Sequence, residues 1–191
     1  MPIRSAVVAA LLLLAALAHA SAEEKAGDPL WTEFRSPERG FSIDFPGTPK
    51  MTSAPVEGQN PLLQYDFQVS VGDDLVYSVV VFEYPSGKGP SPDSDTYLKL
   101  VNAYAKGSES RLRKRGPATV AGYPGFEAIS DDRQSKLSHL IDIVPARDRI
   151  YMLVTAGPRG HATGADAVRF RDSFRLLGDD APARAAANPE E

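Results

Sequence analysis

The stretch LVYSVVVF, residues 75 to 82, decides the fold because it is apolar at nearly every position. Successive side chains of a β-strand point to opposite faces of the sheet, so a strand with one wet face carries alternating polar residues. Val, Tyr and Phe without such alternation predict a strand that is buried on both faces. Other elements must then cover each side of the sheet at this strand, which predicts a layered domain.

The segment GFSIDFPGTPK, residues 40 to 50, predicts a strand with its own stop signal. Phe41, Ile43 and Phe45 alternate with polar residues, so they share the face that points to the core. Pro46 ends the strand because proline has no N–H to donate to a sheet ladder. We therefore interpret this segment as architecture.

Further strands follow from alternation and from turn residues between apolar runs. Residues 63–71 alternate apolar and polar side chains, and Gly72-Asp73-Asp74 predicts the hairpin turn that joins them to the next strand. Consecutive strands with short connections pair antiparallel. The other strands are expected at about residues 31–34, 110–120, 123–130, 136–145 and 149–156.

Two helices are expected, one in the middle of the chain and one at its end. The first follows a loop at residues 85–96, which is rich in Pro, Gly and Ser. The second spans about residues 164–177, where Thr163 and Asp166 resemble a capping box and Gly178 takes the position after the last turn. The apolar stripe of the first helix consists of Tyr97, Leu98, Val101, Tyr104 and Ala105.

These elements predict an α+β domain, an antiparallel sheet of about six to seven strands flanked by two main helices. Four segments then occur in a distinctive order: FRSPERGFSIDFPGTPK (34–50), AGYPGFEAI (121–129), RDRIYMLVTAG (147–157) and AVRFRDSFRLL (167–177). In that order they resemble the PsbP-like α/β/α sandwich. This is the fold of the extrinsic PsbP subunit of photosystem II and of many secreted bacterial proteins of unknown function.

The resemblance implies a fold and an accessory role, and it implies no catalytic reaction. It covers most of residues 31–178, and members of this fold that are understood act mostly as binding or accessory subunits. No functional residue is carried over, because one fold hosts many functions. The matching residues are core and turn positions: Phe41, Phe45, Pro46, Gly125, Tyr151, Phe170 and Phe174.

The N-terminus predicts secretion. Arg4 precedes an unbroken run of Ala, Val and Leu at residues 6–18, and small-x-small patterns follow it. This is typical of a signal peptide, here residues 1–22, with cleavage after Ala20 or Ala22. The apolar run is shorter than a helix that spans a bilayer, so no transmembrane anchor is expected after cleavage.

The remainder of the chain predicts one domain between two polar ends. Residues 23–30 are expected to form a flexible lead-in, residues 31–178 the single PsbP-like domain, and residues 179–191 a disordered acidic tail. A net charge of −4 argues against general nucleic-acid binding, which needs a basic surface. The absence of cysteine excludes a lipoprotein anchor, disulfides and a cysteine nucleophile, so a bacterial periplasmic or extracellular protein is expected.

The two histidines outside the signal peptide are the first candidates for chemistry. His139 and His161 lie in different elements and lack a metal-ligand spacing such as H-x-x-x-H. His139 alternates with Leu137 and Ile141, which favours a half-buried structural role. Glu127 on the adjacent strand would orient its imidazole if the register brought the two together. No catalytic residue, metal ligand or cofactor is assigned, since no G-x-S-x-G, P-loop or S-x-x-K motif occurs.

Two basic features are candidates for binding an acidic or anionic partner. Arg111, Arg113 and Arg115 alternate along a predicted strand and would line one face of it. A strand edge protected by charge is the alternative. Arg159 and His161 lie in the glycine-rich loop before the last helix, whose free N–H groups attract anions. A plain connector is the alternative there.

The sequence therefore predicts a secreted or periplasmic, non-catalytic accessory or binding module. Its expected partner is an envelope or periplasmic protein, and neither a nucleic acid nor a cofactor is expected. One alternative is a small hydrolase-type enzyme with a site assembled from scattered residues around His139 or His161. Another is a binder of a small apolar or anionic ligand, held between sheet and helix.

Overall fold

The computed structural model describes residues 30–56, 62–85, 94–134 and 136–178. The predicted signal peptide, residues 23–29 of the lead-in and the predicted tail lie outside these residues. Within the described ranges, no helix has both the length and the hydropathy needed to cross a membrane.

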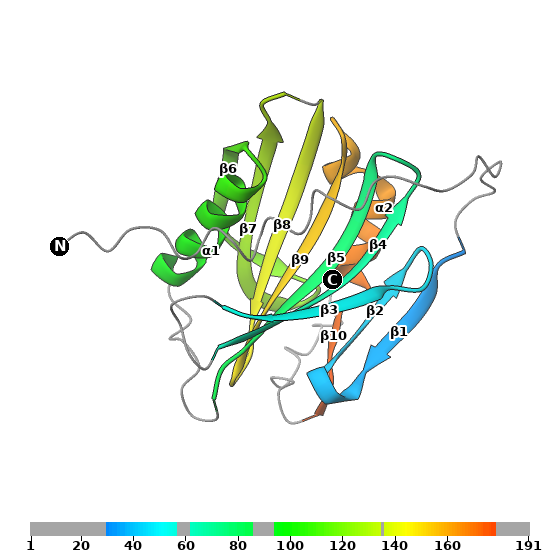
Figure 1. Cartoon of the computed structure of the whole chain (residues 1–191), viewed down its shortest axis with the longest axis vertical. Helices are drawn as coiled ribbons and strands as arrows, with labels where there is room; N and C mark the ends of the chain where they lie inside the picture. Colours follow the sequence, from blue (N-terminus) through cyan, green and yellow to red (C-terminus); the bar gives the residue numbers. More distant parts are fainter. Residues whose placement is uncertain (1–29, 57–61, 86–93, 135, 179–191) are drawn as a thin grey trace, which may run out of the picture.

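A seven-stranded antiparallel sheet forms the centre of the domain (Figure 1), in the order β3-β4-β5-β9-β8-β7-β6. Each strand pairs antiparallel with its neighbours, so β3 and β6 are the two edges. The strands are β3 Lys50–Pro55, β4 Leu63–Val71, β5 Leu75–Glu83, β6 Ser110–Val120, β7 Tyr123–Asp132, β8 Leu137–Pro145 and β9 Arg149–Pro158.

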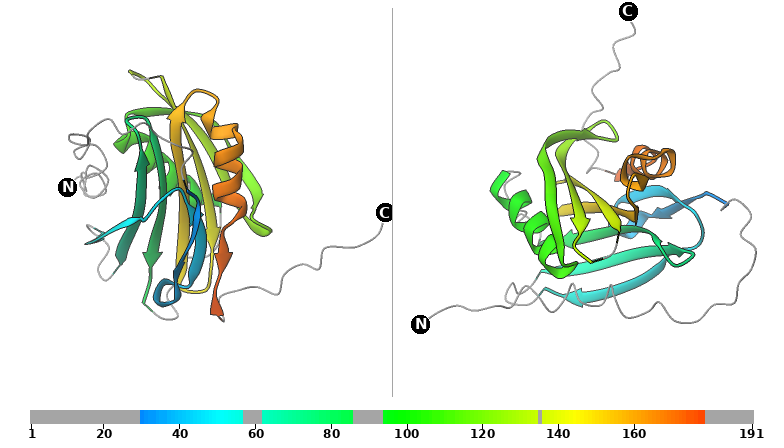
Figure 2. Two further views of the ribbon diagram at one scale, coloured as in Figure 1. Left: turned by 90° about the vertical axis from the view of Figure 1, so that its right-hand side faces the viewer. Right: turned by 90° about the horizontal axis from the view of Figure 1, so that it is seen from above.

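A small second sheet and two helices cover the large sheet. Figure 2 shows α1 on one face, and α2 with the small sheet on the other. The small sheet has the order β1-β2-β10 and is antiparallel. The bounds are β1 Thr32–Ser36, η2 Pro37–Arg39, β2 Phe41–Phe45, α1 Ser94–Gly107, η3 His161–Thr163, α2 Ala165–Asp172 and β10 Arg175–Leu176.

The strand β5 lies inside the layers, as its composition predicts. Val79 and Val81 belong to the core that the small sheet and α2 cover. Val80 and Phe82 point the other way, into the core under α1. The first core is closed by Phe41, Ile43 and Phe45 of the small sheet, by Phe170 of α2 and by Phe174 between α2 and β10, all fully buried. The predicted α+β class and the core role of β2 are confirmed.

The end of the domain differs from the prediction of a helix over residues 164–177. The helix α2 stops at Asp172, and Arg175 and Leu176 form the short strand β10 against β2. Two hydrogen bonds explain the early stop: the Asp44 N–H donates to Ser173 Oγ, and the Leu177 N–H donates to the Gly40 carbonyl. The chain is thereby drawn into the small sheet.

The predicted caps of this helix are also wrong. Gly164 is the N-cap residue and contributes no side-chain hydrogen bond, while Thr163 Oγ1 donates back to the Gly160 carbonyl. Gly178, with a φ of 74°, follows β10 instead of a last helical turn. The prediction also missed β3, which carries no apolar alternation.

Candidate functional site

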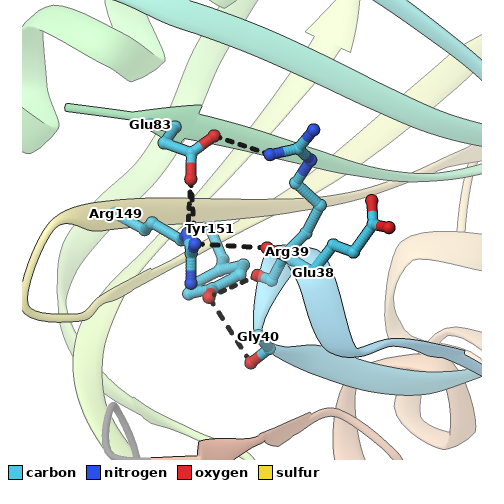
Figure 3. Close-up of polar contacts among 6 residues, drawn as sticks. All are labelled: Glu38, Arg39, Gly40, Glu83, Arg149 and Tyr151. Carbon is cyan, nitrogen blue, oxygen red and sulfur yellow. Dashed lines mark hydrogen bonds and ion pairs between the residues drawn. The ribbon is translucent and has the colours of Figure 1, made fainter. Parts of the chain in front are cut away.

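A group of four side chains joins the small sheet to the large one, and we name it the Glu83 network (Figure 3). Its members are Arg39, Glu83, Arg149 and Tyr151. Glu83 ends β5 and lies directly opposite Arg149, the first residue of β9. Arg39 ends the turn η2, and Gly40 after it takes a left-handed conformation, φ 71°, that returns the chain into β2.

The carboxylate of Glu83 lies between two guanidinium groups, as Figure 3 shows. Its Oε2 accepts from Arg39 Nη1 at 2.8 Å, and its Oε1 accepts from Arg149 Nη2 at 2.8 Å and Nε at 3.2 Å. All three side chains are 20–24% exposed, so solvent screens them less than a surface pair. Burial lowers the pKa of Arg149, but hydrogen bonds with Glu83 and Tyr151 raise it overall.

The same network holds the backbone of the η2 turn. Tyr151 donates from its hydroxyl to the Arg39 carbonyl at 2.8 Å and lies 3.4 Å from the Gly40 carbonyl oxygen. Arg149 Nη2 also donates to the Glu38 carbonyl at 3.2 Å. Carbonyls at a tight turn need partners when they are taken from water. The network therefore positions the turn, and with it Arg39, over the large sheet.

The guanidinium of Arg39 also contacts the strand β4 of the large sheet. Its guanidinium carbon lies 3.7 Å from the centre of the Tyr65 ring on β4, which is the geometry of a cation–π contact. Within the described part of the chain, Arg39 donates one side-chain hydrogen bond, from Nη1 to Glu83. Arg39 shares the single carboxylate of Glu83 with Arg149, so its guanidinium has no carboxylate partner of its own among the described contacts.

A strip of residues at the β3 edge adjoins Arg39, and we name it the β3 edge surface; its β3 residues and Leu63 are exposed, while Tyr65 and Arg39 are half-buried. Directly paired residues of neighbouring strands share a face. Met51 pairs with Phe67, Ser53 with Tyr65, and Pro55 with Leu63, so these residues share the face that carries Arg39. Met51 is 56% exposed and Leu63 is 42% exposed. The β3 edge surface consists of Met51, Ser53, Pro55, Leu63, Tyr65 and Arg39.

The arginines predicted from sequence lie at the opposite edge of the large sheet, on β6. A β-bulge between Leu112 and Lys114 shifts the register, so Arg111 pairs with Asp131 while Arg115 pairs with Ala128. Asp131 and Ala128 point to opposite faces of β7, because they are three residues apart.

The prediction that the three arginines line one face is therefore wrong. Arg113 lies 3.4 Å from Asp131 Oδ2, and Arg115 instead contacts Asn102 on α1. The bulge puts Arg115 on the α1 side of the sheet, away from Arg111. The edge position of β6 agrees with the alternative reading of an edge strand protected by charge.

The other predicted pair, Arg159 and His161, lies after β9 but makes separate contacts. Arg159 is exposed, and its N–H donates to the Lys136 carbonyl. His161 Nε2 lies 3.1 Å from the hydroxyl of Tyr77, a buried residue of β5. Burial lowers the pKa of His161, and burial with the nearby Asp166 charge raises the pKa of Tyr77 to about 12. This pairing favours a structural role for His161.

His139 does not meet Glu127, because the register does not allow the carboxylate–imidazole pair that depended on it. The register pairs Ser130 with His139 and Glu127 with Asp142, which places the two on opposite faces. His139 instead meets α1, where its Nδ1 lies 2.8 Å from the Tyr104 hydroxyl. Burial lowers the pKa of His139, although nearby Asp132 and Asp131 oppose this.

A buried carboxyl group, Asp142, lies under α2 opposite the partly exposed Glu127 and was not predicted. Asp142 is 1% exposed, directly opposite Glu127, and its Oδ1 has no hydrogen-bond partner among the described residues. Lys114 Nζ lies 2.9 Å from Glu127 Oε1, and Arg171 Nη1 lies 3.8 Å from Oε2. Burial raises the pKa of Asp142 to about 7, partly opposed by Arg171. No group of three or more potential metal ligands occurs in the described ranges.

The sequence offered only a weak signal for the Glu83 network. Arg39 directly precedes the turn glycine Gly40, and Glu83 and Arg149 flank the two most apolar strands. Charged residues at the ends of buried strands need partners, which is the one clue that the sequence contains. The partners themselves depend on the pairing of β5 with β9.

Comparison with solved structures identifies the fold through one likeness. Neither a family model nor a curated protein matches the chain. The solution structure of cyanobacterial PsbP (CyanoP) from Synechocystis is similar with a TM-score of 0.53 and 15% identity, over 82% of this chain and 98% of that one. A protein of unknown function from Pseudomonas aeruginosa, PA94, has a TM-score of 0.40 and 13% identity, over 72% of this chain and 89% of that one. By its likeness to the cyanobacterial structure, this chain has the PsbP-like fold.

Proposed function

We propose that this protein is a secreted, non-catalytic binding module that attaches to a protein partner in the periplasm or envelope. The observation that carries the proposal is the β3 edge surface. It combines an exposed strand edge with two exposed large apolar side chains, Met51 and Leu63, beside the charged group of Arg39. Exposed apolar groups rimmed by charge are typical of protein-binding surfaces.

Two further observations support a binding role. The Glu83 network fixes Arg39 at the turn, so the surface is held in place before a partner arrives. Pre-organised surfaces lose less conformational entropy on binding. The sequence resemblance adds that understood members of this fold act mostly as accessory subunits, and the predicted signal peptide favours a location outside the cytoplasm.

The test is affinity capture of the mature protein's partner from an envelope extract of its own organism. We expect one stoichiometric protein, retained by wild type and by Val168→Lys but lost with Met51→Lys. Val168 is the matched control, since it is an exposed apolar residue on α2, far along the chain from β3.

Other outcomes of the capture count against the proposal. Equal retention by both variants, or loss with both, removes the support that the β3 edge surface gives it. Recovery of no stoichiometric protein, together with a hydrolase activity that disappears in His139→Ala, would favour an enzyme.

A further inference from the structure

We infer that the β3 edge surface binds an extended segment of the partner as an added β-strand. On the face of the sheet that carries Met51, Ser53 and Pro55, apolar and acidic side chains alternate along this segment. The inference rests on the proposed binding function and names the kind of partner segment. Strand addition to a sheet edge is a general mode of peptide recognition, in which backbone hydrogen bonds supply affinity and side chains supply specificity.

The first argument is the state of the β3 edge. Its inner side pairs with β4 from Lys50 to Pro55, and no other strand of the described residues pairs with it. Five of its six residues are exposed, so neither face of the strand is covered. An uncovered edge presents a row of backbone N–H and C=O groups that another strand can satisfy.

The second argument is the contrast with β6, the other edge of the same sheet. β6 carries Arg111, Arg113, Lys114 and Arg115, a bulge between Leu112 and Lys114, and Pro117. Charges, bulges and proline are the features that prevent strands from pairing with an edge. On β3 the only charged residue is Lys50 and the only proline is Pro55, at its two ends, so residues 51–54 are left without such protection. The sheet thus blocks one edge and leaves the other ready to pair.

The third argument concerns charge. An added strand would lie about 4.8 Å beyond β3, with one of its residues opposite Ser53. The next residue inward on that face is Tyr65, which lies under the Arg39 guanidinium. Ser53 is small and exposed, so an acidic side chain opposite it can reach over β3 toward Arg39. A carboxylate there would face the Arg39 guanidinium, which shares its one carboxylate partner with Arg149.

The fourth argument concerns the apolar positions. Residues two apart on a strand share a face, so the neighbours of that acidic residue would lie opposite Met51 and Pro55. Met51 and Leu63 would lose exposed apolar area against an apolar side chain at these positions. The expected segment therefore reads apolar, any residue, acidic, any residue, apolar.

The test uses a library of random linear peptides displayed on phage and selected against the mature protein. We expect selected peptides to carry the alternating apolar and acidic pattern, and to slow amide hydrogen exchange at residues 50–55. Ser53→Glu should weaken a selected synthetic peptide by about tenfold or more in fluorescence anisotropy, because it repels the acidic side chain. Thr119→Glu, at an exposed position of β6, should leave the affinity unchanged.

Several results would overturn the inference. Selected peptides that lack the alternating pattern would contradict it. It would also be contradicted if Ser53→Glu did not change the affinity of a selected peptide, or if a peptide slowed amide exchange on β6 instead of β3. Self-association of the protein that Ser53→Glu abolishes would make a second copy the occupant.

The envelope partner separates this inference from the proposed function. A captured partner that is lost with Met51→Lys but kept by Ser53→Glu overturns strand addition and leaves the binding function intact. Failure to capture any stoichiometric partner counts against the proposed function as well.

Discussion

Glu83 and Arg149 lie directly opposite each other where β5 ends and β9 begins, with Oε1 of the glutamate 2.8 Å from Nη2 of the arginine. The other oxygen of the same carboxylate accepts from Arg39, which lies 44 residues earlier in the chain. One side chain of the large sheet therefore holds a turn of the small sheet. The β3 edge surface depends on this link, because Arg39 reaches Tyr65 from that turn.

Glu83→Gln should destabilise the fold, because it keeps the shape of the side chain and removes its charge. Two guanidinium groups, each less than a quarter exposed, would lose their counter-charge. We expect the free energy of unfolding to fall by about 1–3 kcal/mol, since an unpaired and partly buried charge is costly. Urea denaturation at neutral pH measures the change.

The control for this variant is Glu33→Gln, which breaks the exposed pair between Glu33 and Arg35. Exposed pairs contribute little, so a change below about 0.5 kcal/mol is expected. If the two variants were equally mild, the Glu83 network would not be what holds the turn in place.

Asp142→Asn should change the pH dependence of stability. Burial raises the pKa of Asp142 from 3.8 to about 7 in the folded protein. The unfolded chain therefore loses this proton more readily, and the free energy of unfolding falls as pH rises from about 4 to about 7. Asp142→Asn removes this loss. Above pH 7 the free energy of unfolding of the variant should therefore exceed that of wild type by on the order of a few kcal/mol.

The measurement is a series of urea denaturation curves between pH 4 and pH 8. The charged groups that face Asp142 are Glu127, Arg171, Asp172 and Lys114. Asp172→Asn serves as the control, because Asp172 is exposed and should leave most of the pH-dependent loss in place. A difference between Asp142→Asn and wild type that stays constant across this range would mean that Asp142 does not titrate near pH 7.

The fold could be predicted from sequence where burial leaves a periodic pattern. The continuous apolar run of residues 75–82 predicts a strand that is buried on both faces, as β5 is. The alternation in residues 63–71 predicts β4 with the bounds that the structure has. β3 could not be found in this way, because a strand exposed on both faces has no apolar period. β10 was missed because Phe174 and Leu177 continue the apolar spacing of Ala167 and Phe170 after the helix has ended.

The candidate site was harder to predict, because its partners lie far apart in the sequence. Glu83 is 66 residues from Arg149 and meets it only through the pairing of β5 with β9. The arginines of β6 show a second limit, since the single bulge near Arg113 moves Arg115 to the other face. A bulge has no reliable sequence signal, and one extra residue reverses every face assignment after it.

Tyr104→Phe should destabilise the core under α1. It removes the hydroxyl that lies 2.8 Å from His139 Nδ1 and leaves that buried nitrogen without its partner. We expect a loss of about 1–3 kcal/mol in the free energy of unfolding. Tyr84→Phe is the control, because the Tyr84 hydroxyl makes no hydrogen bond with the described residues, and little change is expected there. A loss of the same size in both variants would place the effect in ring packing instead of the hydrogen bond.

Gly125→Ala should destabilise the sheet strongly, although it adds only one methyl group. A Cβ at Gly125 would collide with the backbone carbonyl oxygen of Ile143 on the paired strand β8. This oxygen belongs to the backbone of an inner strand, so the collision cannot be relieved by a side-chain rotation. We expect a loss of about 3 kcal/mol or more, measured as the urea midpoint of the purified protein.

Gly116→Ala is the matched control on the neighbouring strand β6. A Cβ at Gly116 meets no atom within 4 Å, and alanine restricts the unfolded chain more than glycine does. Its stability should stay the same or rise by up to about 1 kcal/mol. If Gly125→Ala is too unstable to purify while Gly116→Ala expresses normally, the steric argument holds. If both unfold like wild type, β7 and β8 do not approach as closely at Gly125 as the structure has them.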